Sequence, residues 1–485
     1  MPASSQLPLD AFPAWARLHD VALAGIELQH VDGKGYGFVL NSELQAGQDA
    51  QSPWLIVPRE LVFSSETVQE YAKVDQNFKQ LLQVVGHKSV RIDAMLFLLC
   101  HLVHSQRGQA SSRSITPTPW TEYVRFLPRS IPTPTMWSEP ERLLLKGTSL
   151  EAALEAKLST LADEFDNLGA QTETMPFWNT LLWEHGAASL DDWVLVDAWF
   201  RSRCLELPQV GDAMVPGLDM VNHSGSPSGF YEVDGNADVV LLARPDCAAP
   251  CGGEVAISYG QNKSAAEMLF SYGFIDRDGT THSLTLPLDP FPDDPLAKAK
   301  VHVFGRPRTF KVTRDDQRLE WQSPFVHLMC LNEEDGLEFR IVQDTGGKGQ
   351  LRLLWQGDDV TGRASDLETL VQDHPLCQVF RLRAVAVLLE RIETQLAKLK
   401  GDPSDDKLQP LIAAGLLREE CIAAARTLRQ AETGLLEAAV EALESEKSTL
   451  LTHDQVVAYL GAMEDGRNDE APLGTTHNEG EDDFS

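Results

Sequence analysis

Met214-Val-Pro-Gly-Leu-Asp-Met-Val-Asn-His-Ser224 is an apolar stretch that carries a carboxylate and ends on an amide and an imidazole. The hydrophobic segment Gly253-Glu-Val-Ala-Ile-Ser-Tyr-Gly260 predicts a strand that delivers Tyr259. Leu269-Phe-Ser-Tyr-Gly-Phe274 adds an aromatic turn that carries Tyr272. These segments offer amide, imidazole and phenol groups in an apolar frame, without an obvious general base. Such a site suits a polar cofactor beside a narrow aromatic slot better than it suits hydrolysis.

Composition indicates a soluble globular protein of two or three domains. The chain has 485 residues, of which 43% are hydrophobic and 23% are charged. Acidic residues outnumber basic residues by 72 to 41, so the formal net charge is −31. A surface of this sign repels nucleic acid and anionic membranes and attracts basic proteins. The acidity either recruits a basic partner or only aids solubility.

Cysteine usage and the N-terminus predict a reducing, intracellular location, in the cytoplasm, the nucleus or both. Seven scattered cysteines are too few for a disulfide scaffold, and the closest pair, Cys247 and Cys251, is a weak metal signal. The first ten residues lack the basic start and apolar core of a signal peptide. We therefore expect no metal, no nucleic acid and no membrane among the ligands, and we expect a monomer.

A glycine-rich motif lies near the N-terminus, in Asp32-Gly-Lys-Gly-Tyr-Gly-Phe38. Glycines that alternate in this way let the backbone approach another group closely, because they have no Cβ and tolerate positive φ. The motif is neither a Walker loop nor a dinucleotide fingerprint, since Phe38 takes the place of the third glycine. Taken alone, it is more typical of a glycine-rich hairpin turn than of a ligand-binding loop.

The rest of the chain divides by its pattern. Residues 64–206 are mainly helical, and strand character returns near 206–260. A Pro/Asp-rich linker at 287–295 precedes residues 296–463, which hold a few alternating segments and then long helical ones. Residues 464–485 carry eight acids and one arginine, so they predict a disordered acidic tail. His101 and His104 lack a third ligand, and we interpret them as core or solvated residues.

The combined motifs resemble those of the SET-domain protein methyltransferases, in the branch of the Rubisco large-subunit lysine methyltransferase. That family carries a Gly-x-Gly element, an Asn-His-Ser segment threaded past a following strand and a Tyr-Gly ending, and all three occur here in order. Branch features also match, in the helical insertion and before the aromatic turn: Pro119-Trp-Thr-Glu-Tyr123, Leu127-Pro128, Trp137-Ser-Glu139, Lys146-Gly-Thr148 and the run from Asn262 to Phe274.

The resemblance implies an α+β fold. A SET domain over residues 15–285 would carry a helical insertion at about 64–206. An α-helical substrate-binding domain would follow over 296–463. The implied cofactor is S-adenosylmethionine, and the implied partner is a protein substrate.

The resemblance also implies roles for individual residues. Those at the cofactor would be Lys34, Gly35 and Tyr36 in the glycine turn, Arg203 at the cofactor carboxylate, Asn222 and His223 at the adenine, and Asp219, whose role could equally be structural. Tyr259 would place its hydroxyl near the transferring methyl group, as catalytic residue and cofactor contact. Tyr231 and Tyr272 would line the channel for the target side chain, next to Leu205.

Methyl transfer explains why such residues suffice. It is an in-line displacement from a sulfonium to a neutral amine, so positioning is most of the task. A lysine, with a pKa of about 10.4 in water, loses its proton more readily when it is buried beside a cation. Aromatic walls fit the alkyl stem and favour an incoming cation.

The sequence thus predicts a protein-lysine N-methyltransferase that acts on a non-histone protein, such as a basic ribosomal protein. Histidine-directed members of the branch carry an amide two residues after the cofactor arginine, where this chain has the apolar Leu205. Histidine methylation is the nearest alternative. A non-catalytic SET-fold binding module is the other.

Overall fold

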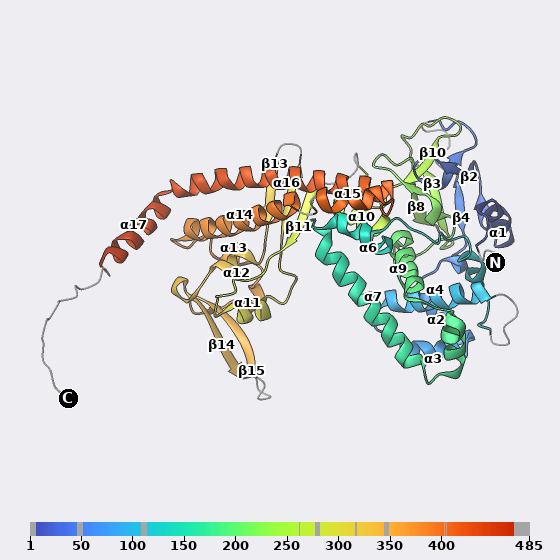
Figure 1. The fold of residues 1–485 in the computed structure, drawn as a ribbon, viewed down its shortest axis with the longest axis horizontal. Helices are drawn as coiled ribbons and strands as arrows, with labels where there is room; N and C mark the ends of the chain where they lie inside the picture. Colours follow the sequence, from blue (N-terminus) through green and yellow to red (C-terminus); the bar gives the residue numbers. More distant parts are fainter. Residues whose placement is uncertain are drawn as a thin grey trace, which may run out of the picture. The chain divides into compact units, whose positions relative to one another are not determined.

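A computed structural model describes residues 6–45, 52–107, 114–260, 262–276, 282–315, 318–343, 349–401, 403 and 405–469 (Figure 1). The chain falls into two units. The first comprises Met1–His282 with Asp402–Ala431, and the second comprises Ser283–Gly401 with Glu432–Ser485. None of the helices in the described part of the chain is both long enough and apolar enough to cross a membrane.

Two four-stranded sheets form the β-structure of the first unit. In one sheet the order is β1-β4-β9-β8, and in the other it is β2-β3-β10-β7. Their bounds are β1 Ala22–Leu23, β4 Leu55–Val57, β9 Val239–Ala243, β8 Gly229–Val233, β2 Ile26–Val31, β3 Gly35–Leu40, β10 Glu254–Ile257 and β7 Asn222–His223. Gly25, with φ of +72°, separates β1 from β2.

The stretch 214–224 is fixed by pairing that is distant in sequence. β7 runs parallel to β10, with Asn222 opposite Ala256 and His223 opposite Ile257, while the other edge of β10 pairs antiparallel with β3. Next to β7, the Ser224 N–H donates to the Ile257 carbonyl at 3.0 Å. The short 3₁₀ turn Leu218–Met220 is buried just before β7. The segment is therefore threaded along a strand that is formed more than thirty residues later in the sequence.

Helices between β4 and β5 form the insertion, which gathers on one side of the sheets in Figure 1. Ser64 caps the first of them, and its side chain accepts from the Thr67 N–H. Trp178, Trp193 and Trp199 are buried as core residues. The helices are α2 Ser65–Val74, α3 Gln76–Val84, α4 Val90–Arg107, α5 Pro119–Tyr123, α6 Glu139–Arg142, α7 Leu150–Thr172, α8 Pro176–Trp178 and α9 Leu190–Arg203.

Two elements aim side chains at the site. α9 begins at the capping residue Ser189 and ends at Arg203, from which the chain turns into the hairpin of β5 (Leu205–Leu207) and β6 (Gly211–Ala213). α10 (Ala265–Tyr272) ends at Gly273, whose φ is +86°. A Cβ at Gly273 would lie 2.6 Å from the backbone of Pro132, so only glycine fits there.

The second unit combines two three-stranded sheets with helices around its own hydrophobic core. Its strands are β11 His282–Pro287, β12 Thr309–Asp315, β13 Arg318–Gln322, β14 Leu337–Gln343, β15 Gly349–Trp355 and β16 Asp358–Asp359. Its helices are α11 Ala297–Phe304, α12 Val326–Cys330, α13 Leu367–Leu370, α14 Cys377–Gly401, the later part of α16 (Glu419–Leu451) and α17 Asp454–Asp469.

Two sequence-derived boundaries differ from this arrangement. Residues 402–431, which the pattern assigned to the C-terminal domain, belong to the first unit. The apolar stripe Leu417, Cys421, Ala425 and Leu428 packs there against Trp137 and other residues of the insertion. The predicted disordered tail at 464–485 is helical up to Asp469, as the end of α17. Its remaining residues, 470–485, lie outside the described part of the chain.

An ion pair holds the segment 402–431 in the first unit. Glu141 is 2% exposed and accepts from the Arg418 guanidinium at 2.7 and 2.9 Å and from the Arg418 N–H at 3.1 Å. These bonds hold the pKa of Glu141 well below its ordinary value. A carboxylate with a lowered pKa in the folded state stabilises that state above its unfolded pKa, and this contribution is lost as the pH falls toward the folded pKa.

We expect Glu141→Gln to lower the free energy of unfolding at pH 7 by about 1–3 kcal/mol, because a charge-assisted contact is replaced by a neutral one. Urea denaturation followed by circular dichroism measures this loss. The gap between variant and wild type should shrink as the pH falls below about 4.3. Glu139→Gln, at an exposed position of the same helix, is the matched control. Equal effects of the two variants would contradict a stabilising role for the ion pair.

Candidate active site

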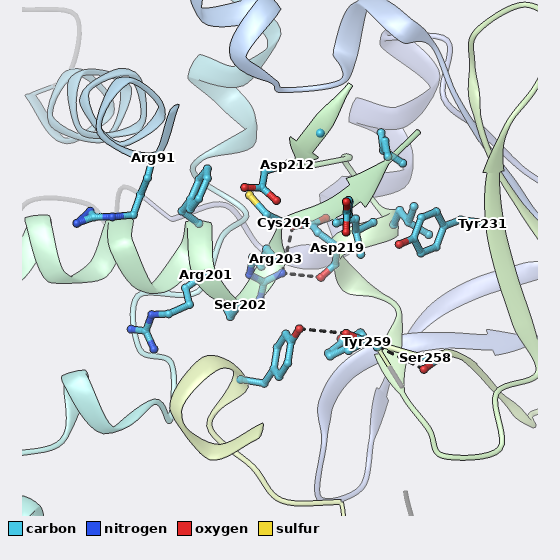
Figure 2. A pocket seen from close by; sticks show the side chains of 18 of the residues that line it. Arg91, Arg201, Ser202, Arg203, Cys204, Asp212, Asp219, Tyr231, Ser258 and Tyr259 are labelled. Atoms are coloured by element: carbon cyan, nitrogen blue, oxygen red, sulfur yellow. Dashed lines mark hydrogen bonds and ion pairs between the residues drawn. The ribbon is translucent and has the colours of Figure 1, made fainter. Parts of the chain in front are cut away.

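A cavity of about 870 Å³ lies in the first unit, along the end of α9 and the β5–β6 hairpin. Figure 2 shows Arg91 and Arg201 on one side of it, Tyr231 on the other, and Arg203 and Asp219 between them. Six of the residues predicted for the site line it: Arg203, Leu205, Asp219, Tyr231, Tyr259 and Tyr272. The cavity therefore brings together residues that are up to sixty-nine positions apart in the sequence.

Tyr259 is held from three directions at the end of β10. Its hydroxyl donates to the Val221 carbonyl at 2.8 Å, and its N–H donates to His223 Nδ1 at 3.1 Å. The Tyr272 hydroxyl donates to the Tyr259 carbonyl at 3.2 Å. Burial raises the pKa of Tyr259 well above its ordinary value. The phenol is thus a fixed, neutral group across the physiological pH range.

Aromatic rings form one wall of the cavity beside Tyr259. The centroids of Tyr259 and Tyr272 lie 4.8 Å apart, and behind them the Phe274 ring, which does not line the cavity, lies 6.3 Å from Tyr272. Tyr231, on β8, also lines the cavity. Burial raises the pKa of both Tyr231 and Tyr272. Neutral rings packed in this way suit an alkyl chain that ends in a polar or cationic group.

Arg203 is anchored by a buried carboxylate. Its Nη1 donates to the Asp219 carbonyl at 2.9 Å and to Asp219 Oδ2 at 3.2 Å. Asp219 also accepts from the Tyr123 hydroxyl and, at 3.1 Å, from the Gly217 N–H. Burial raises the pKa of Asp219, and Arg203 opposes that rise. Arg203 Nε has no hydrogen-bond partner among the described residues, and the side chain is 20% exposed and lines the cavity, so the guanidinium keeps donors for a ligand.

The glycine turn meets the Asn-His segment next to this cavity. Lys34 Nζ lies 2.7 Å from Glu254 Oε2 and 3.4 Å from the His223 carbonyl, and Asn222 Nδ2 donates to Glu254 Oε1 at 2.9 Å. Lys34, Gly35, Tyr36, Asn222 and His223 do not line the cavity itself. They are connected to it by the bond from Tyr259 to His223. The predicted cofactor residues are therefore divided: Lys34, Asn222 and His223 lie around Glu254 beside the cavity, whereas Arg203, Asp219 and Tyr259 line it.

His223 is a neutral structural link. Burial lowers its pKa, and Asp276, whose Oδ2 lies 3.3 Å from Nε2, opposes that effect. Because Nδ1 accepts from the Tyr259 N–H, the proton of the neutral ring lies on Nε2, which faces Asp276. His223 is thereby occupied at both nitrogens.

Sequence reasoning missed three partners of these residues: Glu254, Asp276 and Tyr123. Tyr123 belongs to a branch motif and Glu254 starts the strand of Tyr259, but their contacts link positions 32 to 220 residues apart. Local sequence patterns do not predict contacts between residues so far apart. Within the described ranges, no group of three histidine, cysteine or acidic side chains has the arrangement of a metal site.

Comparison with known proteins agrees with this architecture. No family model matches the chain. It is 29% identical over 364 residues to the SET domain-containing protein 8 of Schizosaccharomyces pombe, covering 74% of this chain and 79% of that protein. It is 29% identical over 237 residues to the chloroplastic Rubisco large subunit N-methyltransferase of Pisum sativum, covering 46% and 48% of the two chains.

A solved structure of the SET domain of LSMT, bound to methyllysine and AdoHcy, superposes with a TM-score of 0.65 at 20% identity and covers 93% of this chain and 94% of that one. The fold is therefore that of the SET-domain methyltransferases, and the α+β prediction is confirmed. Within that class, the chain resembles the branch that contains the Rubisco large-subunit methyltransferase, so the resemblance drawn from the sequence is also confirmed.

Close packing of Gly37 on Asn222 yields a test of the site's geometry. A Cβ at Gly37 would lie 2.5 Å from Asn222 Nδ2. We expect Gly37→Ala to lower the free energy of unfolding by about 1–3 kcal/mol, since one of the two must shift. Thermal unfolding measures the loss.

Gly235→Ala is the matched control, because nothing lies within 4 Å of its added Cβ. In an Asn222→Ala background, Gly37→Ala should cost much less, since the clashing amide is gone. An unchanged cost in that background would place the strain elsewhere.

Proposed function

We propose that the protein is an S-adenosylmethionine-dependent protein-lysine N-methyltransferase that acts on a non-histone protein. The observation that carries this proposal is the placement of Tyr259. Its backbone is bound to His223 of the predicted cofactor cluster, while its ring faces a cavity walled by Tyr231 and Tyr272. A methyl donor bound on one side of the Tyr259 phenol and a target amine bound on the other side would meet beside the phenol.

The residues present fit the cofactor. The partly exposed guanidinium of Arg203 suits a carboxylate, and the Asn222–His223 segment with the Lys34–Tyr36 turn offers backbone groups to the remaining parts. When bound, S-adenosylmethionine supplies a methyl group activated by the neighbouring sulfonium. The related LSMT structures hold AdoMet or AdoHcy.

The chain's own residues would orient and desolvate the target amine. Aromatic walls exclude water from the lysine stem, and desolvation disfavours the ammonium form, so the amine reaches its neutral, nucleophilic state. The Tyr259 hydroxyl, fixed on the Val221 carbonyl, defines one side of the space that the amine enters. The proton leaves for solvent as the amine is buried. Positioning, and not a strong base, then accounts for the rate.

Leu205 favours lysine over histidine. It lines the cavity next to the Arg203 end of α9 and offers no hydrogen bond. An imidazole needs its second nitrogen held by a polar group to present the first one for attack. An apolar side chain suits the flexible lysine stem instead.

The charge of the chain supports a basic partner. A net charge of −31 attracts cationic proteins over long range, and a ribosomal protein is the type of substrate we propose. Such a substrate would place the enzyme in the cytoplasm, the nucleus or both, and a monomer suffices for the site.

Tyr259→Phe tests the catalytic role. We expect kcat to fall by about a hundredfold or more, since the group that positions the amine loses its polar atom. Cofactor affinity should stay within about threefold, because the bond to His223 uses the backbone. The measurements are transfer of label from S-adenosylmethionine to proteins of a cell extract, and calorimetry with the cofactor.

Tyr459→Phe, a half-buried tyrosine of the second unit, is the control. Amino-acid analysis of the labelled product should yield methyllysine. Methylhistidine would overturn the lysine assignment. An absence of both label and cofactor binding in the wild type would indicate a non-catalytic module.

The pH dependence distinguishes the amine from the phenol. The pKa of Tyr259 is raised, so this hydroxyl stays protonated as the pH increases and adds no ionisation. We therefore expect kcat/KM to rise between about pH 7 and 9, as the target amine loses its proton. The slope should be the same in Tyr259→Phe. A slope that disappears in the variant would show that the phenol titrates.

A further inference from the structure

A cluster of cations occupies the end of the cavity opposite Tyr231. Figure 2 shows Arg91 and Arg201 there, and Lys157 of α7 completes the group. All three contact one carboxylate: Asp197 lies 3.5 Å from Arg91, 2.7 Å from Lys157 and 3.1 Å from Arg201. The side chain of Asp197 is only 1% exposed, so it is covered by the cations that surround it.

The charges at this end do not balance. Arg91 also binds Glu164, at 2.6 Å, and within the described part of the chain the three cations are paired with these two carboxylates. The cluster therefore holds one surplus positive charge, in a chain whose net charge is −31. Burial lowers the pKa of Lys157, Asp197 opposes this, and the neighbouring arginines lower it further. An added anion would relieve that repulsion.

Lys157 has the spare hydrogen-bonding capacity. Arg201 uses four of its five donors on structural partners, namely the Phe270 carbonyl, Thr135 and, twice, Asp197. The Lys157 ammonium has three donors, and Asp197 is the partner that the described residues give it. Its side chain is 18% exposed and lines the cavity. At least one of its donors is therefore available to a ligand.

We propose that this end of the cavity is a specificity subsite that binds an acidic side chain of the substrate, aspartate or glutamate, near the target lysine. The inference rests on the proposed function, because the same cavity receives the lysine beside Tyr259. Lys157 and Arg91 contact the carboxylate, and Asp197 holds the cations in place from beneath.

Helix geometry gives an approximate spacing, because Arg203 at the end of α9 lies close enough to Tyr259 to oppose the rise of its pKa. Asp197 and Arg203 lie six residues apart on α9, which corresponds to about 9 Å along its axis at about 1.5 Å per residue. An extended peptide rises by about 3.3 Å per residue. The acidic residue should therefore stand about three positions from the methylated lysine.

Two acidic residues of the cavity fit this polarity, although Lys263 adds a cation near Tyr272. Glu206 and Asp212 belong to the β5–β6 hairpin. Glu206 is close enough to Tyr231 to add to the rise in the pKa of this tyrosine that burial causes. A lysine ammonium would be attracted to the hairpin side and a carboxylate to the Lys157 side. One substrate segment with both charges can satisfy both ends.

The test compares Lys157→Gln with wild type on the same substrate. Proteins of a cell extract are labelled by the wild type with S-adenosylmethionine, and the methylated sites are mapped by mass spectrometry. We expect aspartate or glutamate about three residues from the lysine. A mapped substrate is then purified with that acid and, separately, with the corresponding amide.

For the wild type, we expect the acid-to-amide change to lower kcat/KM by about five- to tenfold through KM, as for a partly buried ion pair. In Lys157→Gln the two substrates should be used equally. Lys157→Arg should restore the preference, and Lys79→Gln, an exposed lysine of α3, should leave it intact.

Two results would overturn the subsite. One is a set of methylated sites without neighbouring acids, and the other is an acid preference that is the same in wild type and Lys157→Gln. A wild type that labels no protein would instead refute the proposed function, and the subsite with it.

Discussion

The parallel pairing of β7 with β10 is the constraint on which the site depends. Two residue pairs, Asn222 with Ala256 and His223 with Ile257, bring a threaded segment against a strand that is already paired with β3 on its other edge. Parallel pairs need long connections, because the chain must return to the same end of the sheet. Here that connection includes β8 and β9, and β8 carries Tyr231 into the cavity. The topology that threads the segment thus also builds the opposite wall of the slot.

Electrostatics act on two length scales in this chain. The net charge of −31 acts on an approaching partner as a whole, although solvent salt screens it beyond about 8 Å. The Arg91–Lys157–Arg201 cluster acts inside a cavity, where screening by salt is weaker. A single carboxylate of the substrate is therefore sufficient for a favourable interaction there. A basic substrate protein with one acid beside its target lysine is consistent with both. Long-range attraction would set the rate of encounter, and the local contact would select the lysine.

Sequence predicted the parts of the site that lie within contiguous motifs. Tyr259, Tyr272, Asn222 and His223 stand in short patterned segments, and Arg203 lies at the end of the stretch predicted to be helical. The partners that fix these residues were not predictable, because Glu254 and Tyr123 are joined to them only by tertiary pairing. The stripe at 417–428 was recognisable as helical, yet its periodicity could not say which core it packs against. The cation cluster draws on α4, α7 and α9, so no single segment carries its pattern.

The site's polar groups are committed to one another, which limits what the protein itself can do to a proton. Asp219 is bound by Arg203, Tyr123 and Gly217, and His223 is occupied at both nitrogens. Tyr259 keeps its proton and uses it on the Val221 carbonyl. None of these groups is a free base at neutral pH. Deprotonation of the amine must then come from its transfer into an aromatic cavity beside a cation, where the charged form is the less stable one. The same hydrogen-bond partners hold the side chains of the cavity in place. The entropy cost of ordering the site therefore falls in folding and not in the reaction.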